Sequence, residues 1–227
     1  MENTVDNPQS EDTFIENSLS KEQILNWYMT DVLEGNLPKN VFLFSKNHGI
    51  QENDFYIFFN SFESIEKYFF VLVFEKTFET LKNSDQYPGY PGKEKLLSFY
   101  YTFFGNLTVN RSFVLYLLKP VKLENLKKLS GLQKRFMEYI GSLEIEKPDL
   151  RQKDLKKLQD RALEAGAWTQ FLVILRFWLG DESIGFEKTD IFIEKSITAG
   201  FDLINVQPLK SMADLGKFIF KEFKAAG

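Results

Sequence analysis

Few side chains in this 227-residue sequence are of the types that carry catalysis or hold metal ions: there is one histidine, His48, and no cysteine. Without cysteine or a second histidine, a transition-metal site with thiolate or imidazole ligands is excluded in practice. A serine nucleophile would depend on His48 as its base, and the 13 glycines form neither a nucleophile elbow nor a phosphate-binding loop. The sequence therefore predicts a protein that is not an enzyme, with no catalytic residue, no metal and no cofactor.

The remaining charged candidates are two carboxylate pairs and one arginine. Asp181–Glu182 and Glu144/Glu146 fall in predicted turns where nothing would raise a pKa, so we interpret them as exposed charge. Arg176 interrupts the apolar stretch ILRFW. A buried guanidinium needs an acidic or carbonyl partner, or the head group of a ligand. An ion pair within the chain, an ion pair across a dimer and ligand recognition all remain open for Arg176.

From Val41 to Ile65 the spacing of residues is that of a helix-turn-helix. Gly49 stands where a left-handed turn needs a residue without a side chain, and Ile50 would fill the turn. A second short helix, starting near Gln51, would bury two phenylalanines one turn apart. The residues that would pack between the two helices are Val41, Phe44, Ser45, Phe55 and Phe59.

This pattern resembles the N-terminal domain of tetracycline-repressor-type (TetR) regulators, and the resemblance covers roughly Gln23 to Leu81. The family's pattern is matched by Ser45, Gly49, Ile50, Tyr56, Phe58 and Phe59, and Ser61 with Glu63 opens the next helix. The resemblance implies an all-α fold with a three-helix head and a larger helical body that binds a ligand and dimerises. We expect a disordered acidic tail over 1–20, the head and connecting helix over 21–82, and the body over 83–227.

The motif also departs from the family where DNA phosphates are usually contacted. A hydroxyl, a histidine and a lysine are replaced by Asp54, Phe58 and Phe62, and Lys21 to Glu66 holds three lysines against seven acidic residues. Because phosphate neutralisation supplies much of DNA affinity, this favours weak binding, or a motif kept only for packing. The residues left to contact duplex DNA are Lys39, Lys46, Gln51, Asn53 and Tyr56.

The rest of the chain reads as helices separated by breakers. A long helix is predicted from Ser61 to about Lys82, and the breaker cluster 83–92 ends it. Apolar periodicity and turn residues predict the further helices 93–104, 111–118, one opened by Pro148, 186–205 and 209–224. The segment 167–179 is apolar nearly all round, so it should not lie on the surface of a monomer. In the family the last two long helices pair with a second subunit, and we expect a homodimer; closure of the monomer's own core is the alternative.

The sequence has 24 phenylalanines, enough for a packed interior and a ligand pocket. An apolar or amphipathic ligand would lie between aromatic helices, although such stripes are more often plain core. The candidate lining residues are Phe99, Phe103, Phe113, Tyr116, Trp168, Phe171 and Arg176.

Two hypotheses for the function of the protein remain open. A charge of −4 gives no general attraction to nucleic acid, and the acidic, polar first twenty residues are unlike a signal peptide, so we expect a cytoplasmic protein. The first hypothesis is a TetR-type regulator whose ligand changes DNA binding. The second is a TetR-fold lipid-binding protein without DNA function, similar in plan to the lipid-binding accessory protein of ubiquinone biosynthesis. Only in this alternative would the lysine-rich segment 209–224 lie on a membrane surface.

Overall fold

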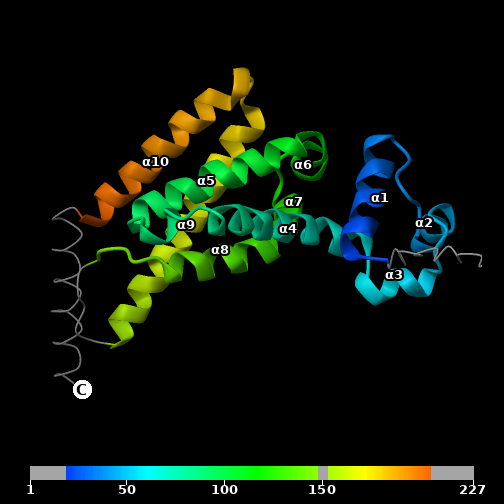
Figure 1. Ribbon diagram of the computed structural model, residues 1–227, viewed down its shortest axis with the longest axis horizontal. Coiled ribbons are helices and arrows are strands. Elements are labelled where there is room, and N and C mark those ends of the chain that lie inside the picture. Colours follow the sequence, from blue (N-terminus) through cyan, green and yellow to red (C-terminus); the bar gives the residue numbers. More distant parts are fainter. Residues whose placement is uncertain (1–18, 148–152, 206–227) are drawn as a thin grey trace, which may run out of the picture. The chain divides into compact units, whose positions relative to one another are not determined.

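The computed structural model describes residues 19–147 and 153–205, all of them in helices, turns and connecting loops, with no strand among them (Figure 1). The predicted all-α fold is confirmed. The chain divides between Asn60 and Ser61 into two compact units, here called the N-terminal and the C-terminal unit. The predicted tail, apart from residues 19 and 20, and the predicted helix 209–224 lie outside the described residues, as does Pro148.

From residue 19 on, the N-terminal unit contains three helices, α1 (Lys21–Leu33), α2 (Val41–Asn47) and α3 (Glu52–Phe58). Ser20 begins α1 by accepting a hydrogen bond from the Gln23 N–H (3.1 Å), as its sequence position predicts. Asn40 caps α2 in the same way through the Leu43 N–H (2.9 Å). The centre of this unit is mainly apolar: the side chains of Ile24, Leu25, Tyr28, Phe44, Phe55 and Phe59 are buried, together with Ser45.

The turn between α2 and α3 has the predicted geometry. Gly49 adopts a φ of +69°, a region in which glycine is not strained. The Ile50 N–H donates to the Ser45 carbonyl (3.0 Å), which closes the C-terminal turn of α2. His48 lies beside this turn, with its Nε2 2.9 Å from the Asp31 carboxylate and its ring stacked on Trp27 at 4.8 Å. The one histidine of the chain therefore joins α1 to the turn.

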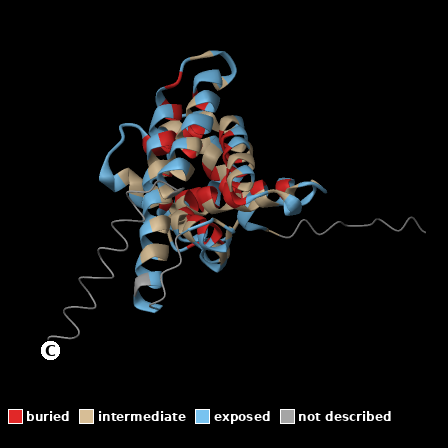
Figure 2. Cartoon of the chain, turned by 90° about the vertical axis from the view of Figure 1, so that its left-hand side faces the viewer, coloured by how far each residue is buried: buried red, intermediate tan, exposed pale blue. Residues whose placement is uncertain are grey.

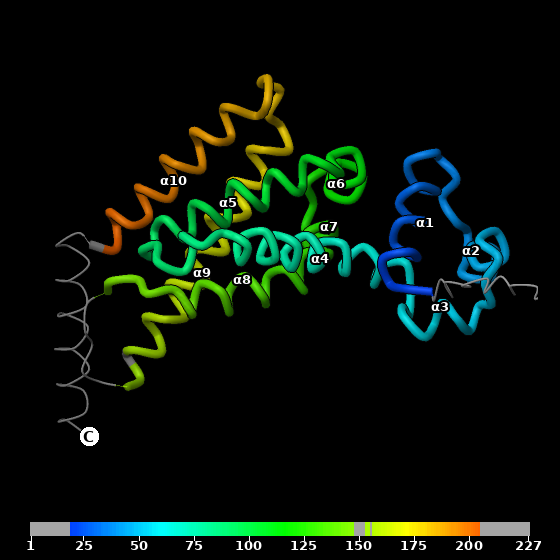
Figure 3. The backbone as a smooth tube through the Cα atoms, in the orientation of Figure 1, coloured from blue at the N-terminus to red at the C-terminus, as the bar shows by residue number. Residues whose placement is uncertain are grey.

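The C-terminal unit begins with the long helix α4 (Phe62–Lys82), whose N-cap is Ser61, and α4 packs against both α5 (Gly92–Val109) and α8 (Ser130–Ser142) (Figure 3). The helix predicted from Ser61 to Lys82 is therefore confirmed. Short elements complete the connections: η1 (Tyr87–Gly89), α6 (Arg111–Leu118), α7 (Leu123–Leu126) and η2 (Lys127–Leu129).

Two long helices end the described chain, α9 (Lys153–Gly180) and, after the short η3 (Ile184–Phe186), α10 (Glu187–Asn205). Helix α9 packs on α8 and on α10, and α10 also packs on α5. The predicted helix 186–205 is confirmed, and α9 continues through Gly166 without a break. Buried residues gather on the sides of the helices that face one another, and the outer turns are exposed (Figure 2).

Helices α4 and α8 lie close together at Gly131. A Cβ atom at this position would lie 2.8 Å from Cγ2 of Val71, so only glycine fits without a shift. Ion pairs lie on either side along the same two helices and the turn before α8: Lys128 pairs with the buried Glu66 (3.0 Å), and Arg135 pairs with Glu75 (2.9 Å). The contact between α4 and α8, here called their seam, therefore combines a close approach of the Gly131 backbone to the Val71 side chain with two ion pairs.

Candidate functional sites

Helix α3 presents an exposed side formed by Gln51, Glu52, Asn53, Tyr56 and Ile57. Opposite them, Phe55 and Phe59 are buried, which fixes the rotation of the helix. Tyr56 is 51% exposed and donates its hydroxyl hydrogen to a Glu52 carboxylate oxygen at 3.2 Å. Partial desolvation, with this hydrogen bond and the Glu52 charge, raises the pKa of Tyr56. The exposed side of α3 thus carries amides, an aromatic ring, an aliphatic chain and one acid.

Asp54 has a structural role in this helix. One of its carboxylate oxygens accepts a hydrogen bond from the Gln51 N–H at 2.9 Å, which satisfies a donor at the start of α3. The acidic residue that replaces a hydroxyl of the family pattern therefore stabilises the first turn of the helix.

The five candidate DNA-contacting residues are all exposed and all lie in the N-terminal unit. Lys39 is in the loop before α2, Lys46 is in the last turn of α2, and the other three are Gln51, Asn53 and Tyr56. Sequence reasoning missed Ile57, which is 68% exposed. Its position in the sequence could have shown this exposure. Ile57 follows Tyr56 by one residue and the buried Phe55 by two, and this spacing places it on the outer side of α3.

Four of the candidate ligand-pocket residues are fully buried in the C-terminal unit: Phe99, Phe103, Phe113 and Phe171. Phe103 lies 5.5 Å from Phe99 and 5.4 Å from Phe171 between ring centroids. Trp168 is half-buried and stacks on Phe171 at 5.1 Å, whereas Tyr116 is 44% exposed. Phe99, Phe103, Phe171 and Trp168 thus form one chain of ring contacts, whereas Phe113 contacts Phe69 and Tyr116.

Arg176 is exposed, so the expectation of a buried guanidinium was wrong. The reason is that α9 has an exposed stripe at helical spacing, formed by Val173, Arg176, Phe177 and Gly180. Sequence alone showed an almost entirely apolar helix and could not show which side the rest of the chain covers. In the single chain this side of 167–179 is exposed, so the prediction that a second subunit covers it stays a prediction.

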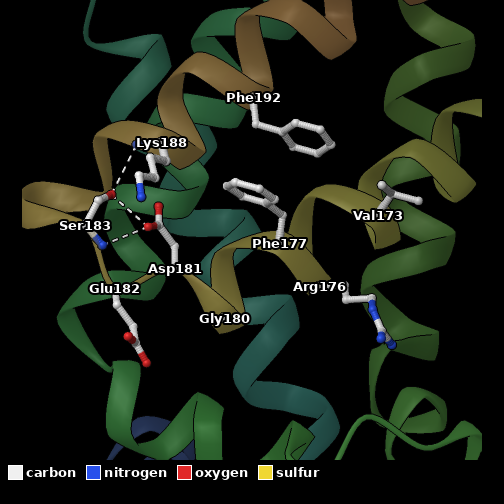
Figure 4. A pocket seen from close by; sticks show the side chains of 9 residues that line it. All are labelled: Val173, Arg176, Phe177, Gly180, Asp181, Glu182, Ser183, Lys188 and Phe192. Atoms are coloured by element: carbon white, nitrogen blue, oxygen red, sulfur yellow. Dashed lines mark hydrogen bonds between the residues drawn. The ribbon is translucent and has the colours of Figure 1, made fainter.

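The exposed stripe of α9 forms one wall of a groove of about 860 Å³, and α10 forms the other (Figure 4). The Phe177 ring stacks on Phe192 of α10 at 4.5 Å and 17°, and Figure 4 shows this aromatic pair between Lys188 on one side and Arg176 on the other. The lining residues are Val173, Arg176, Phe177, Gly180, Asp181, Glu182, Ser183, Lys188 and Phe192.

The corner between α9 and α10 is organised by Asp181, which is 6% exposed. Its carboxylate accepts hydrogen bonds from the Ser183 N–H (2.9 Å) and hydroxyl (2.7 Å), and from the Thr189 N–H (2.9 Å) and hydroxyl (2.6 Å). Burial acts to raise the pKa of Asp181, but these donors outweigh it and lower the pKa to about 2. The interpretation of Asp181 as exposed charge was wrong, because the fold brings Thr189 back onto it.

Arg111 of α6 binds the C-terminal end of α9 through hydrogen bonds to backbone carbonyl groups. Its guanidinium donates to the carbonyl oxygens of Trp178 (3.0 Å) and Asp181 (3.1 Å). The same group lies 4.5 Å from the ring centroids of Trp178 and Phe186. Arg111 therefore satisfies carbonyl groups that a helix end leaves without partners.

Neither a metal site nor a membrane span is found in the part of the chain that the structure describes. No group of three or more histidine, cysteine, aspartate or glutamate residues there could hold a metal ion. No helix there is long and apolar enough to cross a bilayer.

In the residues that the structure describes, the chain combines a three-helix N-terminal unit, which contains a helix-turn-helix, with a helical C-terminal unit. Comparison with family models matches residues 95–219 to the tetracyclin repressor-like C-terminal domain, which is more than half of the chain. The chain therefore belongs to the TetR-like family, and the resemblance seen in the helix-turn-helix is confirmed. A search of curated protein sequences found no significant match.

Proposed function

We propose that this protein is a homodimeric TetR-type transcriptional regulator in the cytoplasm, in which a ligand bound by the C-terminal unit changes the binding of duplex DNA by the N-terminal unit. The observation that carries the proposal is the exposed side of α3, which follows a helix-turn-helix turn with Gly49 at φ +69° in a chain of the TetR-like family.

Dimer formation is supported by the open side of α9. Val173 is 51% exposed and Phe177 38% exposed, and both border the groove between α9 and α10. A helix of a second copy packing in this groove would cover the Phe177–Phe192 pair. With Lys188 and Arg176 beside that pair, an acidic residue of the second copy, such as its Glu182, offers a matching charge.

A ligand site in the aromatic core is supported by two buried polar groups. Within the described residues, the Tyr100 hydroxyl and the Trp178 indole nitrogen are buried and have no hydrogen-bond partner. Both rings contact Phe104, with centroids at 6.2 and 5.8 Å, and burial raises the pKa of Tyr100 well above its ordinary value. An unpaired buried donor destabilises a fold by about 1–3 kcal/mol. An apolar ligand with a hydrogen-bond acceptor would satisfy these donors and displace rings of the core, which include the candidate pocket residues.

Coupling would act through α4, which follows the N-terminal unit directly in the chain. A ligand that moves α4 along its seam with α8 would change the separation of the two helix-turn-helix motifs of a dimer. That separation must match successive major grooves, about 34 Å apart, for both motifs to bind. No catalytic step is part of the proposal.

Binding of the full-length protein to a mixed-sequence duplex of about 30 base pairs, measured by fluorescence anisotropy from about 50 to 200 mM salt, tests the DNA function. Lys39→Ala and Lys46→Ala should each weaken binding and flatten the salt dependence by about one phosphate contact. Lys82→Ala, at the exposed end of α4, is the matched control and should leave both unchanged. Absence of binding near 50 mM salt would refute the regulator.

Dimerisation is tested by sedimentation equilibrium. Phe177→Glu should give a monomer at concentrations where the wild type is a dimer, because it replaces one ring of the Phe177–Phe192 pair by a charged group. Val109→Glu is the control, since Val109 is 82% exposed at the end of α5. A wild type that remains a monomer at about 100 μM, or a Phe177→Glu variant that still dimerises, would refute pairing through this groove.

The second candidate, a lipid-binding protein of the same fold without DNA function, is favoured by the absence of any lysine or arginine on α3. It predicts association with anionic liposomes in flotation experiments and a co-purifying lipid identified by mass spectrometry. In this case the anisotropy experiment would show no binding, and liposome association would depend on residues 209–227.

A further inference from the structure

The exposed side of α3 has a composition that favours one kind of base pair, and the following inference rests on the proposed DNA-binding function. Asn53, Tyr56 and Ile57 are spaced i, i+3 and i+4, so they share one side of the helix, and all three are exposed. Gln51 stands at the N-cap and is also exposed. Together with Glu52, these are the exposed side chains that α3 can offer to base edges in a major groove.

Guanine is the base that α3 is least able to read. The common contact to guanine O6 and N7 comes from arginine or lysine, and the sequence of α3, ENDFYIF, contains neither. The exposed Lys39 and Lys46 lie in the loop before α2 and in its last turn, and lysine in such positions serves phosphates without reading sequence. Reading of guanine by α3 therefore lacks its usual donors, and Glu52, the acid that could accept from cytosine N4, is engaged by the Tyr56 hydroxyl.

Adenine and thymine match what α3 does carry. The amide of asparagine or glutamine can bond adenine N6 and N7 together, which suits Asn53 and Gln51. Ile57, at 68% exposure, is an aliphatic surface of the kind that contacts the thymine C5-methyl group. The hydroxyl of Tyr56 is engaged with Glu52, so its ring is left for apolar contact. The Glu52 carboxylate, in turn, is partly satisfied by Tyr56.

We propose that the N-terminal unit reads A·T base pairs, with Ile57 against a thymine methyl group and Asn53 against an adenine edge, and with no guanine contact from α3. A bidentate amide contact discriminates against the wrong base by roughly 5- to 150-fold. Burial of one methyl group changes affinity by about four-fold. The specificity is therefore carried by two or three side chains of a single short helix.

The experiment uses the full-length protein and four kinds of duplex of about 30 base pairs at about 50 mM salt. The first contains an A·T-rich sequence enriched from a random library, and the second is identical except that deoxyuridine replaces thymine. The third replaces adenine by 7-deazaadenine, which removes N7, and the fourth has G·C pairs at the enriched positions. Because deoxyuridine lacks only the major-groove methyl group, it separates direct reading from the minor-groove shape of A·T-rich DNA.

Wild-type protein should bind the first duplex at least ten-fold more tightly than the G·C duplex, and about four-fold more tightly per contacted thymine than the deoxyuridine duplex. Ile57→Ala should bind the thymine and deoxyuridine duplexes alike, and Asn53→Ala should bind the adenine and 7-deazaadenine duplexes alike. Leu33→Ala, at a 50% exposed apolar position at the end of α1, is the matched control and should retain both differences.

Equal wild-type affinity for thymine and deoxyuridine duplexes, or a library that enriches G·C pairs, would overturn the inference while leaving DNA binding intact. An Ile57→Ala variant that still distinguishes thymine from deoxyuridine would overturn the assignment to Ile57. Absence of binding to all four duplexes would instead refute the proposed DNA function. The base-analogue comparison needs no altered protein, so it does not depend on any variant folding.

Discussion

Replacing Asp181 by alanine would remove the acceptor that holds the corner between α9 and α10. Four donors from two residues converge on its carboxylate, and both Thr189 donors are in a residue that is 1% exposed. A buried donor left without an acceptor destabilises the fold by about 1–3 kcal/mol, whereas the Ser183 donors are only half-buried and can turn to water. Two orphaned Thr189 donors therefore lower the free energy of unfolding by about 3 kcal/mol.

The assay is thermal unfolding followed by circular dichroism at 222 nm, at one fixed protein concentration because a dimer would make the midpoint concentration-dependent. For a chain of this size, 3 kcal/mol lowers the Tm by roughly 6–12 °C. Asp181→Asn keeps the shape and one acceptor oxygen, so its loss should be smaller than that of Asp181→Ala. Glu182→Ala, the exposed neighbour, should stay within about 0.5 kcal/mol of wild type.

The pH dependence gives an independent check. The pKa of Asp181 in the folded chain, about 2, lies below its usual value, so the stabilisation is fully present above the unfolded pKa and is lost as the pH falls through the folded one. The stability difference between wild type and Asp181→Ala should therefore be constant from pH 8 to about pH 5 and shrink below about pH 4. A variant within 0.5 kcal/mol of wild type at neutral pH would refute the reasoning.

Three further changes test other parts of the fold. Gly131→Ala should lower the free energy of unfolding by about 1–3 kcal/mol in urea titrations, because the new Cβ would overlap Val71; the double variant with Val71→Ala should recover part of the loss, and additive losses would contradict the close approach. Arg111→Lys should cost about 1–3 kcal/mol in the same assay, since lysine keeps the charge but cannot bond the Trp178 and Asp181 carbonyls together while stacking between two rings; an unchanged midpoint would count against this cap. Gly49→Ala should lower the free energy of unfolding by about 1 kcal/mol through its left-handed φ alone, because nothing lies within 4 Å of the added Cβ. The loss should appear as faster amide hydrogen exchange in the N-terminal unit, and unchanged protection there would exclude strain at the turn.

Features that depend on neighbours in the chain could be predicted from the sequence. Ser20 and Ser61 cap helices because a serine side chain reaches an N–H three residues on, and Gly49 adopts a positive φ because the turn between two short helices requires it. The long helix α4 begins at its predicted cap Ser61, and the bounds of α6 follow from apolar periodicity. The recognition of the family from a short motif rested on this same local spacing.

Features that depend on contacts between distant segments could not be predicted. From the sequence, Asp181 is expected to be an exposed charge, but the fold brings Thr189 into hydrogen-bond contact with it. Arg176 is expected to be buried, but α8 and α10 pack on other sides of α9 and leave Arg176 exposed. The outward position of Ile57, by contrast, follows from the predicted burial of Phe55 and Phe59, which sets the rotation of α3.

The sequence by itself determined the helical class, the helix-turn-helix and the lack of cations on its second helix, because capping, turn geometry and charge are local properties of the residues. Only the tertiary structure decided which side of α9 stays open, which carboxylate is buried and which rings close the core. Those outcomes depend on packing, and packing is shared among helices that lie far apart in the chain.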